Sequence, residues 1–457
     1  MKHYDVTIVG GGPSGIALAL MLEKTGKKIL LVERENTLGG CWRIEWQNEK
    51  YYTEHSPHIM TSNYKKFMQL CKYLNVRNEF KNTYKYKSSF RSVYLDKNVI
   101  GNLKFSDIIK IVSGLIMSRF IENKQTVDEF CDHISDTGKK VMYILSVAAA
   151  STPDKVMMQD MFDIMTEYPP DIIQMSEPEL WLNTAKKYFD NSDNIDLSLN
   201  TEIKSINYMK NGYTINDVIH TDEVILALPP IALKNILEKS STDIQNNWLP
   251  YPEFKQWADE SSYNSIGFQL HFDQNVEYKD EWCWSCIGDW NIIILPMSKY
   301  LKTFTKDPSI KTVWSCTIID QNKISSRLKK KVHQCTLVEI EEEIKHQLNI
   351  PVNTRVTFYD GLKKNKEQYE SKDTGFVRQK YGVLPYTGKL KNIHIVSTVN
   401  QKGIITMEKA LESAYEFIKL NYNGHQHILD DKGNNTLFAV IILILLTIVL
   451  YKCFKPT

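Results

Sequence analysis

The feature that most constrains this chain is its first segment, where an extended pattern and a helical pattern flank a run of glycines. Residues 4–9 form an apolar, β-branched stretch typical of a buried strand, and it stops at GGGPSG, residues 10–15. A helix is predicted at 17–24 and a second strand at 28–33. A strand, a glycine turn, a helix and a strand in this order predict a βαβ unit and an α/β fold.

The glycines of this turn have separate physical tasks. Gly10 permits the tight turn, Gly12 lets the backbone approach a pyrophosphate, and Gly15 lets helix and strand pack closely. Ser14 lies where free N–H groups and the positive end of the helix dipole face an anion. Glu33 ends the second strand, where a carboxylate accepts hydrogen bonds from ribose hydroxyls and disfavours a 2′-phosphate. We therefore predict a dinucleotide-binding site; a glycine-rich turn without a ligand is the alternative.

Later segments return to the pattern of this domain. Strands are predicted at 197–206, 223–227 and 393–396, a hairpin turn at Asn211 and Gly212, and an amphipathic helix at 406–420. The nucleotide-binding domain is therefore expected to be discontinuous, and an α+β substrate domain rich in Trp and Tyr is interleaved with it. The predicted boundaries are 1–64, 186–245 and 385–425 for the first domain, and 65–185 and 246–384 for the second.

Charge and cysteine content exclude several function classes. Lys and Arg number 56 against 54 Asp and Glu, so the net charge of +2 provides no general field for nucleic acid. The eight cysteines are scattered, which suits a reducing compartment. Cys283 and Cys286 are interpreted as thiols of a strand, with a redox or metal role as the alternative. His55 and His58 lack further ligands, and we expect no metal site.

Three polar or apolar runs are assigned to helices. The basic residues near 327–331 and the acidic residues of 339–343 predict a solvated amphipathic helix. The apolar runs 108–117 and 141–150 are predicted to be core helices. Contact with a membrane, or the lining of a lipophilic tunnel, is the alternative for these two.

The C-terminal segment has a different character. Residues 437–451, LFAVIILILLTIVLY, carry no charge, and Lys432 precedes them while Lys452 and Lys455 follow. After a polar linker at 426–436, residues 437–454 are therefore predicted to form a single-pass transmembrane tail anchor, with the body of the protein facing the cytoplasm. A C-terminal helix docked in the core is the alternative.

The motifs together resemble those of the flavin-containing amine oxidase and protoporphyrinogen oxidase superfamily, whose Rossmann-like FAD-binding domain is interleaved with a substrate domain. ERENTLGG, residues 33–40, matches the twin-glycine motif of that family and implies cofactor roles for Arg34, Gly39 and Gly40. Trp42 gives the motif a GGxW form that is also similar to flavin-containing monooxygenases. TEHSPHIM, residues 53–60, looks like the family segment that ends against the flavin ring, which implies that His58 lies near it.

The resemblance continues in the second half of the chain. Ile203 matches the residue whose backbone holds adenine, and VILALPPIAL, residues 224–233, is similar to the strand and double-proline turn that follow. Thr406 and Met407 begin the helix whose first N–H groups face the flavin pyrimidine. Ser397, Thr398 and Val399 stand where the family has a glycine and an acidic residue, and the hydroxyl of Thr398 is expected to substitute as a hydrogen-bonding group on the ribityl chain.

Other departures bear on the reaction. Cys41 replaces the usual arginine after the twin glycine, a substrate tyrosine position falls on Thr406, and the flavin-side lysine falls on Gly267. A monoamine-type cage is therefore not expected, and the absence of a cysteine at the family's attachment point implies non-covalent FAD.

The resemblance implies an FAD-dependent oxidoreductase. Its flavin takes a hydride from an amine-bearing or lipophilic small molecule that is oxidised or desaturated. The sequence identifies no catalytic base. Two alternatives remain: a non-catalytic binding protein on the same fold, like those that chaperone prenylated GTPases, and a structural membrane flavoprotein.

Overall fold

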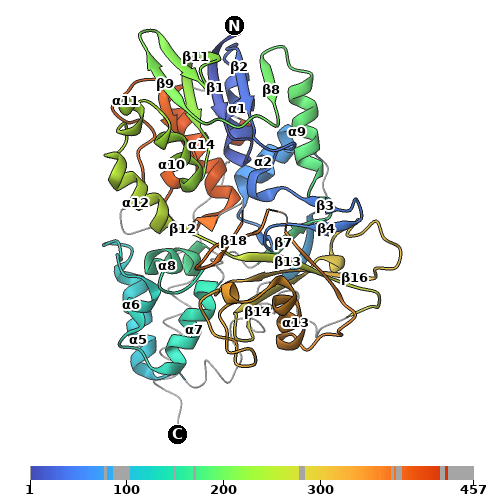
Figure 1. The fold of residues 1–457 in the computed structure, drawn as a ribbon. Helices are drawn as coiled ribbons and strands as arrows, with labels where there is room; N and C mark the ends of the chain where they lie inside the picture. The colour runs from blue at the N-terminus through green and yellow to red at the C-terminus, as the bar shows by residue number, and fades with distance from the viewer. Residues whose placement is uncertain are drawn as a thin grey trace.

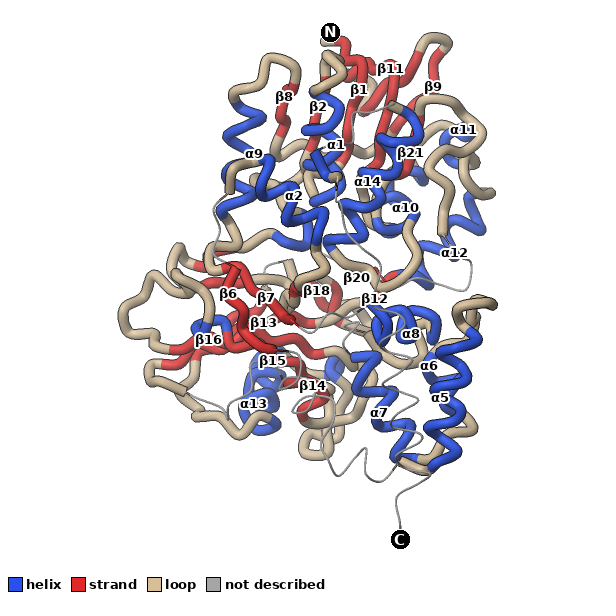
Figure 2. Tube along the Cα trace, turned by 180° about the vertical axis from the view of Figure 1, so that it is seen from behind, coloured by secondary structure: helices blue, strands red, loops and turns tan. Residues whose placement is uncertain are grey.

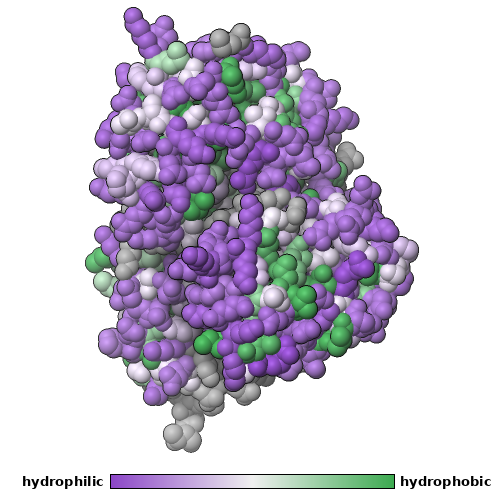
Figure 3. Space-filling view, viewed as in Figure 1, coloured by the Kyte–Doolittle hydropathy of each residue, from purple (hydrophilic) through white to green (hydrophobic). Residues whose placement is uncertain are grey.

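The computed structural model describes residues 2–76, 80–85, 103–147, 151–167, 171–276, 284–359, 361–371, 375–376, 383–422 and 428–430. The chain forms two stacked parts (Figures 1 and 2). The upper part, which holds the N-terminus, is a largely parallel sheet between helices. The lower part contains an antiparallel sheet beside a group of helices. Hydrophilic side chains cover most of the face seen in Figure 3, and apolar ones gather on its lower part.

The upper part is built on a seven-stranded sheet of order β8-β2-β1-β11-β10-β9, with β21 also paired to β11. Strands β8, β2, β1, β11 and β21 run parallel, whereas β10 and β9 form an antiparallel hairpin. The bounds are β1 His3–Val9, β2 Ile29–Val32, β8 Ile195–Ser198, β9 Ile206–Met209, β10 Gly212–Ile215, β11 Ile219–Leu226 and β21 Ile393–Ile395.

Helices cover both faces of this sheet because its parallel strands are apolar on both sides. Ile29 and Leu31 of β2 belong to the core under one set of helices, and Leu30 and Val32 to the core under the other. The first set is α1 Pro13–Glu23, α2 Lys65–Tyr73, α9 Leu180–Asp190 and α14 Met407–Asn421. The second set is α10 Pro230–Glu238, α11 Thr242–Gln245 and α12 Tyr251–Ser261.

The lower part contains a five-stranded antiparallel sheet of order β14-β15-β16-β13-β17. Its strands are β13 Ile266–Phe272, β14 Trp284–Ile287, β15 Ile292–Pro296, β16 Thr312–Ile318 and β17 Arg355–Phe358, and α13 Leu337–Gln347 packs against it. Smaller sheets are formed by β3 Glu45–Gln47, β4 Tyr51–Thr53, β5 Met60–Thr61, β6 Phe80–Lys85, β7 Asp171–Met175, β12 Ser262–Tyr263, β18 Lys363–Lys364, β19 Tyr369–Glu370 and β20 Gly375–Phe376.

A helical cluster completes the lower part. It comprises α5 Phe105–Met117, α6 Val127–Cys131, α7 Asp136–Val147 and α8 Met158–Glu167. Short 3-10 turns are η1 Gly40–Trp42, η3 Met297–Lys299, η4 Val332–Gln334 and η5 Thr398–Asn400. Phe130 and Phe162 meet edge to face at the centre of this cluster.

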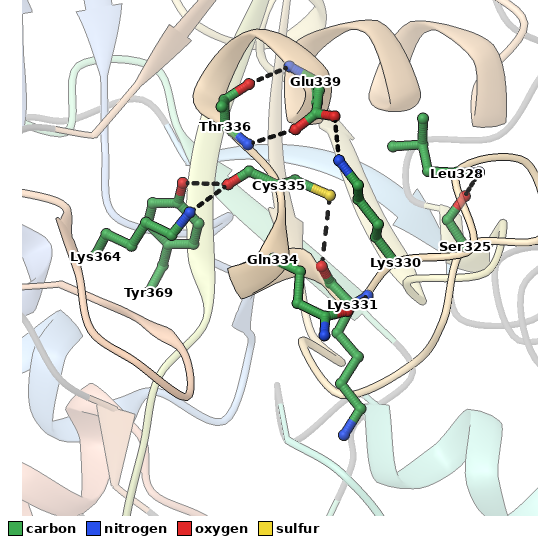
Figure 4. A network of polar contacts seen from close by, with 10 residues as sticks. All are labelled: Ser325, Leu328, Lys330, Lys331, Gln334, Cys335, Thr336, Glu339, Lys364 and Tyr369. Carbon is green, nitrogen blue, oxygen red and sulfur yellow. Dashed lines mark hydrogen bonds and ion pairs between the residues drawn. The ribbon is translucent and has the colours of Figure 1, made fainter.

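The predicted amphipathic helix at 339–343 is α13, but its acidic face is not wholly solvated. Thr336 and Glu339 form a reciprocal capping box at its start, and Lys330 pairs with Glu339 (Figure 4). Glu343 is fully buried and accepts hydrogen bonds from Ser325 Oγ and Arg327 Nε. Burial alone raises the pKa of Glu343, yet these bonds and one from Gln347 hold the pKa below its usual value. The expectation of a solvated face was therefore wrong for this residue.

The βαβ unit agrees with its prediction, with small shifts at the ends. The first helix begins at Pro13, earlier than predicted, because proline suits the first helical position. The single strand predicted at 197–206 is wrong, since β8 ends at Ser198 and β9 begins at Ile206. The helix predicted at 141–150 is α7, which begins at Asp136.

Several predictions fall on residues that the structure does not describe. The tail 437–454, most of the linker 426–436 and Cys283 lie outside the described residues. Within the described part of the chain, no helix has the length and apolar character needed to cross a bilayer. The predicted domain boundaries remain predictions.

Candidate cofactor and substrate site

One cavity of about 450 Å³ is lined by residues of both parts of the molecule, a size typical of cofactor and small-molecule sites. Its nucleotide end is formed by the turn after β1, the end of β2 and the segment 201–203. Its far end is formed by residues 55–59 together with side chains from β15 and β16. We call these the nucleotide end and the far end of the cavity.

The glycine turn places backbone, rather than side chains, against the nucleotide end. Gly10 has φ +107°, and a Cβ there would lie 2.6 Å from Ala227 O, so only glycine fits. A Cβ on Gly40 would lie 3.2 Å from Gly12 Cα, which means that these two backbones face each other closely at the cavity. This narrow backbone cradle fits a pyrophosphate, because an added side chain would fill the space the phosphates need.

Glu33 is fixed by backbone donors. Its Oε2 accepts a hydrogen bond from Gly11 N at 2.7 Å, and its Oε1 accepts one from Glu35 N at 3.0 Å. Both oxygens keep a second lone pair, and the residue lines the cavity. These bonds fix the orientation of the carboxylate, and its role in holding ribose hydroxyls remains a prediction.

Helix α14 points its first turn at the middle of the cavity. Thr406 is its N-cap and accepts a hydrogen bond from Lys409 N, and both Thr406 and Met407 line the cavity. Ser14 also lines it, but its hydroxyl donates to Ala410 O at 2.8 Å and so ties α1 to α14. The hydroxyl of Ser14 is thus engaged within the protein, while the N-terminus of α14 offers a positive dipole end to the cavity.

At the far end an imidazole is held between an aromatic ring and a carboxylate. His58 stacks on Trp42 with ring centroids 4.3 Å apart, and its Nδ1 donates to Glu54 Oε2 at 2.9 Å. Glu54 is buried and also accepts from Tyr52 Oη at 3.1 Å. In the described protein no partner contacts His58 Nε2 or Thr317 Oγ1, although both residues line the cavity. Such orphaned buried polar atoms mark the place of a polar ligand group.

A buried cation also lines the far end. Arg43 donates from Nη2 to Tyr359 Oη at 2.8 Å and pairs through Nε with Glu45 at 3.3 Å. Neither Arg43 nor Glu54 is among the predicted site residues. The only signal for Arg43 is its position directly after the GGxW motif, and the partner Tyr359 is too distant in sequence to be foreseen.

The structure brings together twelve of the fourteen predicted cofactor residues around this cavity. These are Gly10, Gly12, Ser14, Glu33, Arg34, Gly40, Trp42, His58, Ile203, Thr398, Thr406 and Met407. Gly15 and Gly39 do not line it. Gly15 packs against Gly10 O, as predicted for close contact between helix and strand. Gly39 has a φ of +126°, a backbone conformation that favours glycine. The roles of all fourteen residues in cofactor binding remain predictions.

Gly267 stands where the resemblance places the flavin-side lysine of the family, and the structure gives a steric reason for glycine there. A Cβ on Gly267 would lie 1.9 Å from His55 O, so no side chain fits at this point of β13. The described lining of the far end contains no acidic side chain, and apolar residues dominate it: Ile59, Ile293, Phe376, Ile404 and Ile405. Among the described residues no cluster of three or more His, Cys, Asp or Glu has the form of a metal site.

The comparisons with known proteins agree with this geometry. Residues 8–74 match a family model described as a NAD(P)-binding Rossmann-like domain. UDP-galactopyranose mutase of Mycoplasma genitalium is 36% identical over 65 residues, 14% of this chain and 16% of that protein. Matches of this kind span 10%, 16% and 17% of the curated relatives' own lengths.

Solved structures match over nearly the whole chain. Cyclohexylamine oxidase from Brevibacterium oxydans superposes with a TM-score of 0.61 at 13% identity, over 93% of this chain and 98% of that one. A double mutant of putrescine oxidase gives 0.62 at 13% identity, over 96% and 99%. These matches show the predicted fold over nearly the whole chain, and the family model shows a Rossmann-like unit at its start. This chain therefore has the fold of these amine oxidases, and its residues 8–74 form a Rossmann-like dinucleotide-binding unit.

Proposed function

We propose that this protein is an FAD-dependent oxidoreductase that oxidises or desaturates a lipophilic small molecule. The observation that carries the proposal is the continuity of one cavity, with the dinucleotide cradle at one end and an apolar pocket with His58 and Arg43 at the other. Bound FAD would supply the hydride acceptor. The absence of an acidic residue from the described far-end lining favours a neutral or anionic substrate over a cationic amine.

The chain's own residues have distinct parts in this proposal. Glu33, fixed by Gly11 N, would hold the ribose, and the backbone of Gly12 and Gly40 would lie against the pyrophosphate. The N-terminus of α14 would stabilise negative charge on the flavin pyrimidine. Apolar side chains exclude water from the far end, and Arg43 orients a polar or anionic group of the substrate.

A spectrum of the purified chain, with and without added FAD, tests the cofactor. Anaerobic bleaching of the flavin by polyamines, monoamines, porphyrinogens and lipophilic alcohols, followed by peroxide release in air, tests the substrate class. We expect bleaching by a lipophilic compound. Fast turnover of a soluble amine alone would contradict the lipophilic preference.

The same measurements separate the other interpretations. A protein that stays colourless after FAD is added is a non-catalytic binding protein. A bound flavin that no reductant or substrate bleaches indicates a structural flavoprotein.

A second candidate is a rearrangement without net oxidation, which the matches to two UDP-galactopyranose mutases favour. Arg43 would then face an anionic substrate group. The test is incubation of the dithionite-reduced protein with UDP-galactopyranose and chromatography of the product. If no isomer forms, this candidate is rejected.

We also propose that residues 437–454 anchor the protein in a membrane, with the body in the cytoplasm. Alkaline extraction of membranes from expressing cells, combined with protease protection, tests this. Release of the chain by alkali contradicts the anchor, and protection of the body contradicts its orientation.

A further inference from the structure

Helix α5 exposes a stripe of large apolar side chains. Of fourteen exposed large hydrophobic residues in the described protein, six lie within residues 105–121. We call the six the α5 stripe: Phe105, Ile109, Ile116, Met117, Phe120 and Ile121. Their spacing of four, seven, one, three and one residues places them along one side of a helix and its C-terminal turn. Phe120 is 80% exposed and Ile121 65%, which is unusual for such side chains in water.

The opposite side of the same helix is firmly packed, so the stripe is not a displaced core face. Ile111 and Leu115 are buried in the helical cluster with Phe130 and Phe162. Asp107 accepts a hydrogen bond from Ser135 N at 3.0 Å at the start of the neighbouring α7. The expectation that residues 108–117 form a core helix is thus correct for one side only. In Figure 2, α5 lies at the outer edge of the lower part, with α7 on its inner side.

Cationic residues accompany the stripe. Lys104, Lys110, Arg119 and Lys124 belong to residues 103–124, where the acidic residues are Asp107 and Glu122. Four cations and two anions leave this segment a net charge of +2, and Asp107 is buried away from the surface. Of these cations, Lys110 lies over the ring of the buried Phe130. A helix with bulky apolar side chains on one side and an excess of cations along the same segment is the form that lies in the interface of an anionic bilayer.

We propose that the α5 stripe inserts into the interfacial region of an anionic lipid bilayer. The bilayer is favoured over a protein partner because cations beside a convex apolar side complement anionic head groups above acyl chains. The helical cluster also reaches the cavity, since Ile404 lines the cavity and packs against this cluster. Docking by the stripe would therefore hold the far end of the cavity close to membrane-dissolved compounds. The docking itself does not depend on the proposed enzymatic activity.

Vesicle sedimentation of full-length protein tests the proposal. The parent carries Leu443→Arg and Leu446→Arg, which disable the apolar tail so that binding reports on the body alone. We expect it to bind phosphatidylcholine vesicles that contain phosphatidylserine, and to bind less at high salt. Adding Phe120→Ser and Ile121→Ser should weaken binding by about tenfold or more. Both residues are exposed, so thermal unfolding should be unchanged.

The matched control carries Val218→Ser and Val352→Ser, which remove exposed apolar side chains far from α5, and should bind like the parent. Equal binding by the stripe variant and this control overturns the proposal. A parent that does not bind anionic vesicles overturns it as well. If instead light scattering shows a dimer that Phe120→Ser and Ile121→Ser convert to monomer, and vesicles do not bind, the stripe contacts a second copy and the membrane proposal fails.

Discussion

The carboxylate of Glu33 accepts a hydrogen bond from the backbone N–H of Gly11, 22 residues earlier in the chain, at 2.7 Å. This bond joins the end of β2 to the glycine turn after β1. The residue predicted to bind ribose is thus also the residue that holds the glycine turn, predicted to bind phosphate, in place.

Replacement of Glu33 by alanine should weaken FAD binding strongly. The variant loses the ribose acceptor and leaves Gly11 N and Glu35 N without their partner, at a cost of about 1.5–3 kcal/mol for a hydrogen bond to a charged group. Titration by flavin fluorescence should show a Kd raised by about tenfold or more. Glu253→Gln, at an exposed position of α12, is the control. An unchanged Kd for Glu33→Ala would show that the nucleotide does not contact Glu33.

Gly12→Ala should separate folding from cofactor binding. The nearest atom to a Cβ at this position is Gly40 Cα at 3.9 Å, so the methyl group fits the protein but enters the cavity. We expect the free energy of unfolding to stay within about 0.5 kcal/mol of the parent's, as for most surface changes, and we expect FAD binding to be lost. Gly26→Ala is the converse control. Because Gly26 has a φ of +73°, the substitution should lower the free energy of unfolding by about 1 kcal/mol through backbone strain, while FAD binding should persist. Tight FAD binding by Gly12→Ala would rule out the proposed cradle.

Gly267→Ala should destabilise the protein. The added Cβ would meet the backbone atom His55 O at 1.9 Å. The position of a Cβ is fixed by its own backbone, so β13 or segment 55–59 must move. Overpacking of this kind costs about 1–3 kcal/mol. Urea unfolding measures the change. A variant as stable as the parent would show that segment 55–59 moves freely, and that sterics do not exclude a side chain here.

Glu408 should make stability fall as the pH rises. Burial raises the pKa of Glu408 to about 7, even though Lys66 N and Phe67 N donate to its carboxylate. Between pH 4.5 and pH 7 the unfolded chain gives up this proton, whereas Glu408 in the folded chain keeps it. The free energy of unfolding therefore falls over this range by an amount on the order of 3 kcal/mol. Glu408→Gln keeps an acceptor oxygen for only one of these two donors, but it cannot titrate and should remove this part of the pH dependence.

Other buried groups titrate too, so the pH dependence of the free energy of unfolding is compared between Glu408→Gln and its parent. Burial lowers the pKa of His271 and of His394 to about 4, which makes stability rise with pH and so opposes the contribution of Glu408. Denaturant unfolding at pH 5 and pH 8 should show that the parent, relative to Glu408→Gln, shifts toward lower stability at pH 8. Parallel profiles for the two proteins would contradict the prediction.

The sequence by itself determined the βαβ unit, its glycine turn, the acidic end of β2 and the helix that begins at Met407. These features depend on short-range periodicity and on glycine geometry, which neighbouring residues specify. It also led to twelve residues that line a single cavity, because each belongs to a recognisable local motif.

Only the tertiary structure decided the far end of that cavity. Arg43 meets Tyr359 across 316 positions of sequence, and Gly267 leaves no room for a side chain because His55 O lies against it. The structure also decided that α5 packs one side and exposes the other, since an apolar run of helical length does not reveal how many of its sides find a partner. Contacts between distant segments fix these features, and no local pattern encodes them.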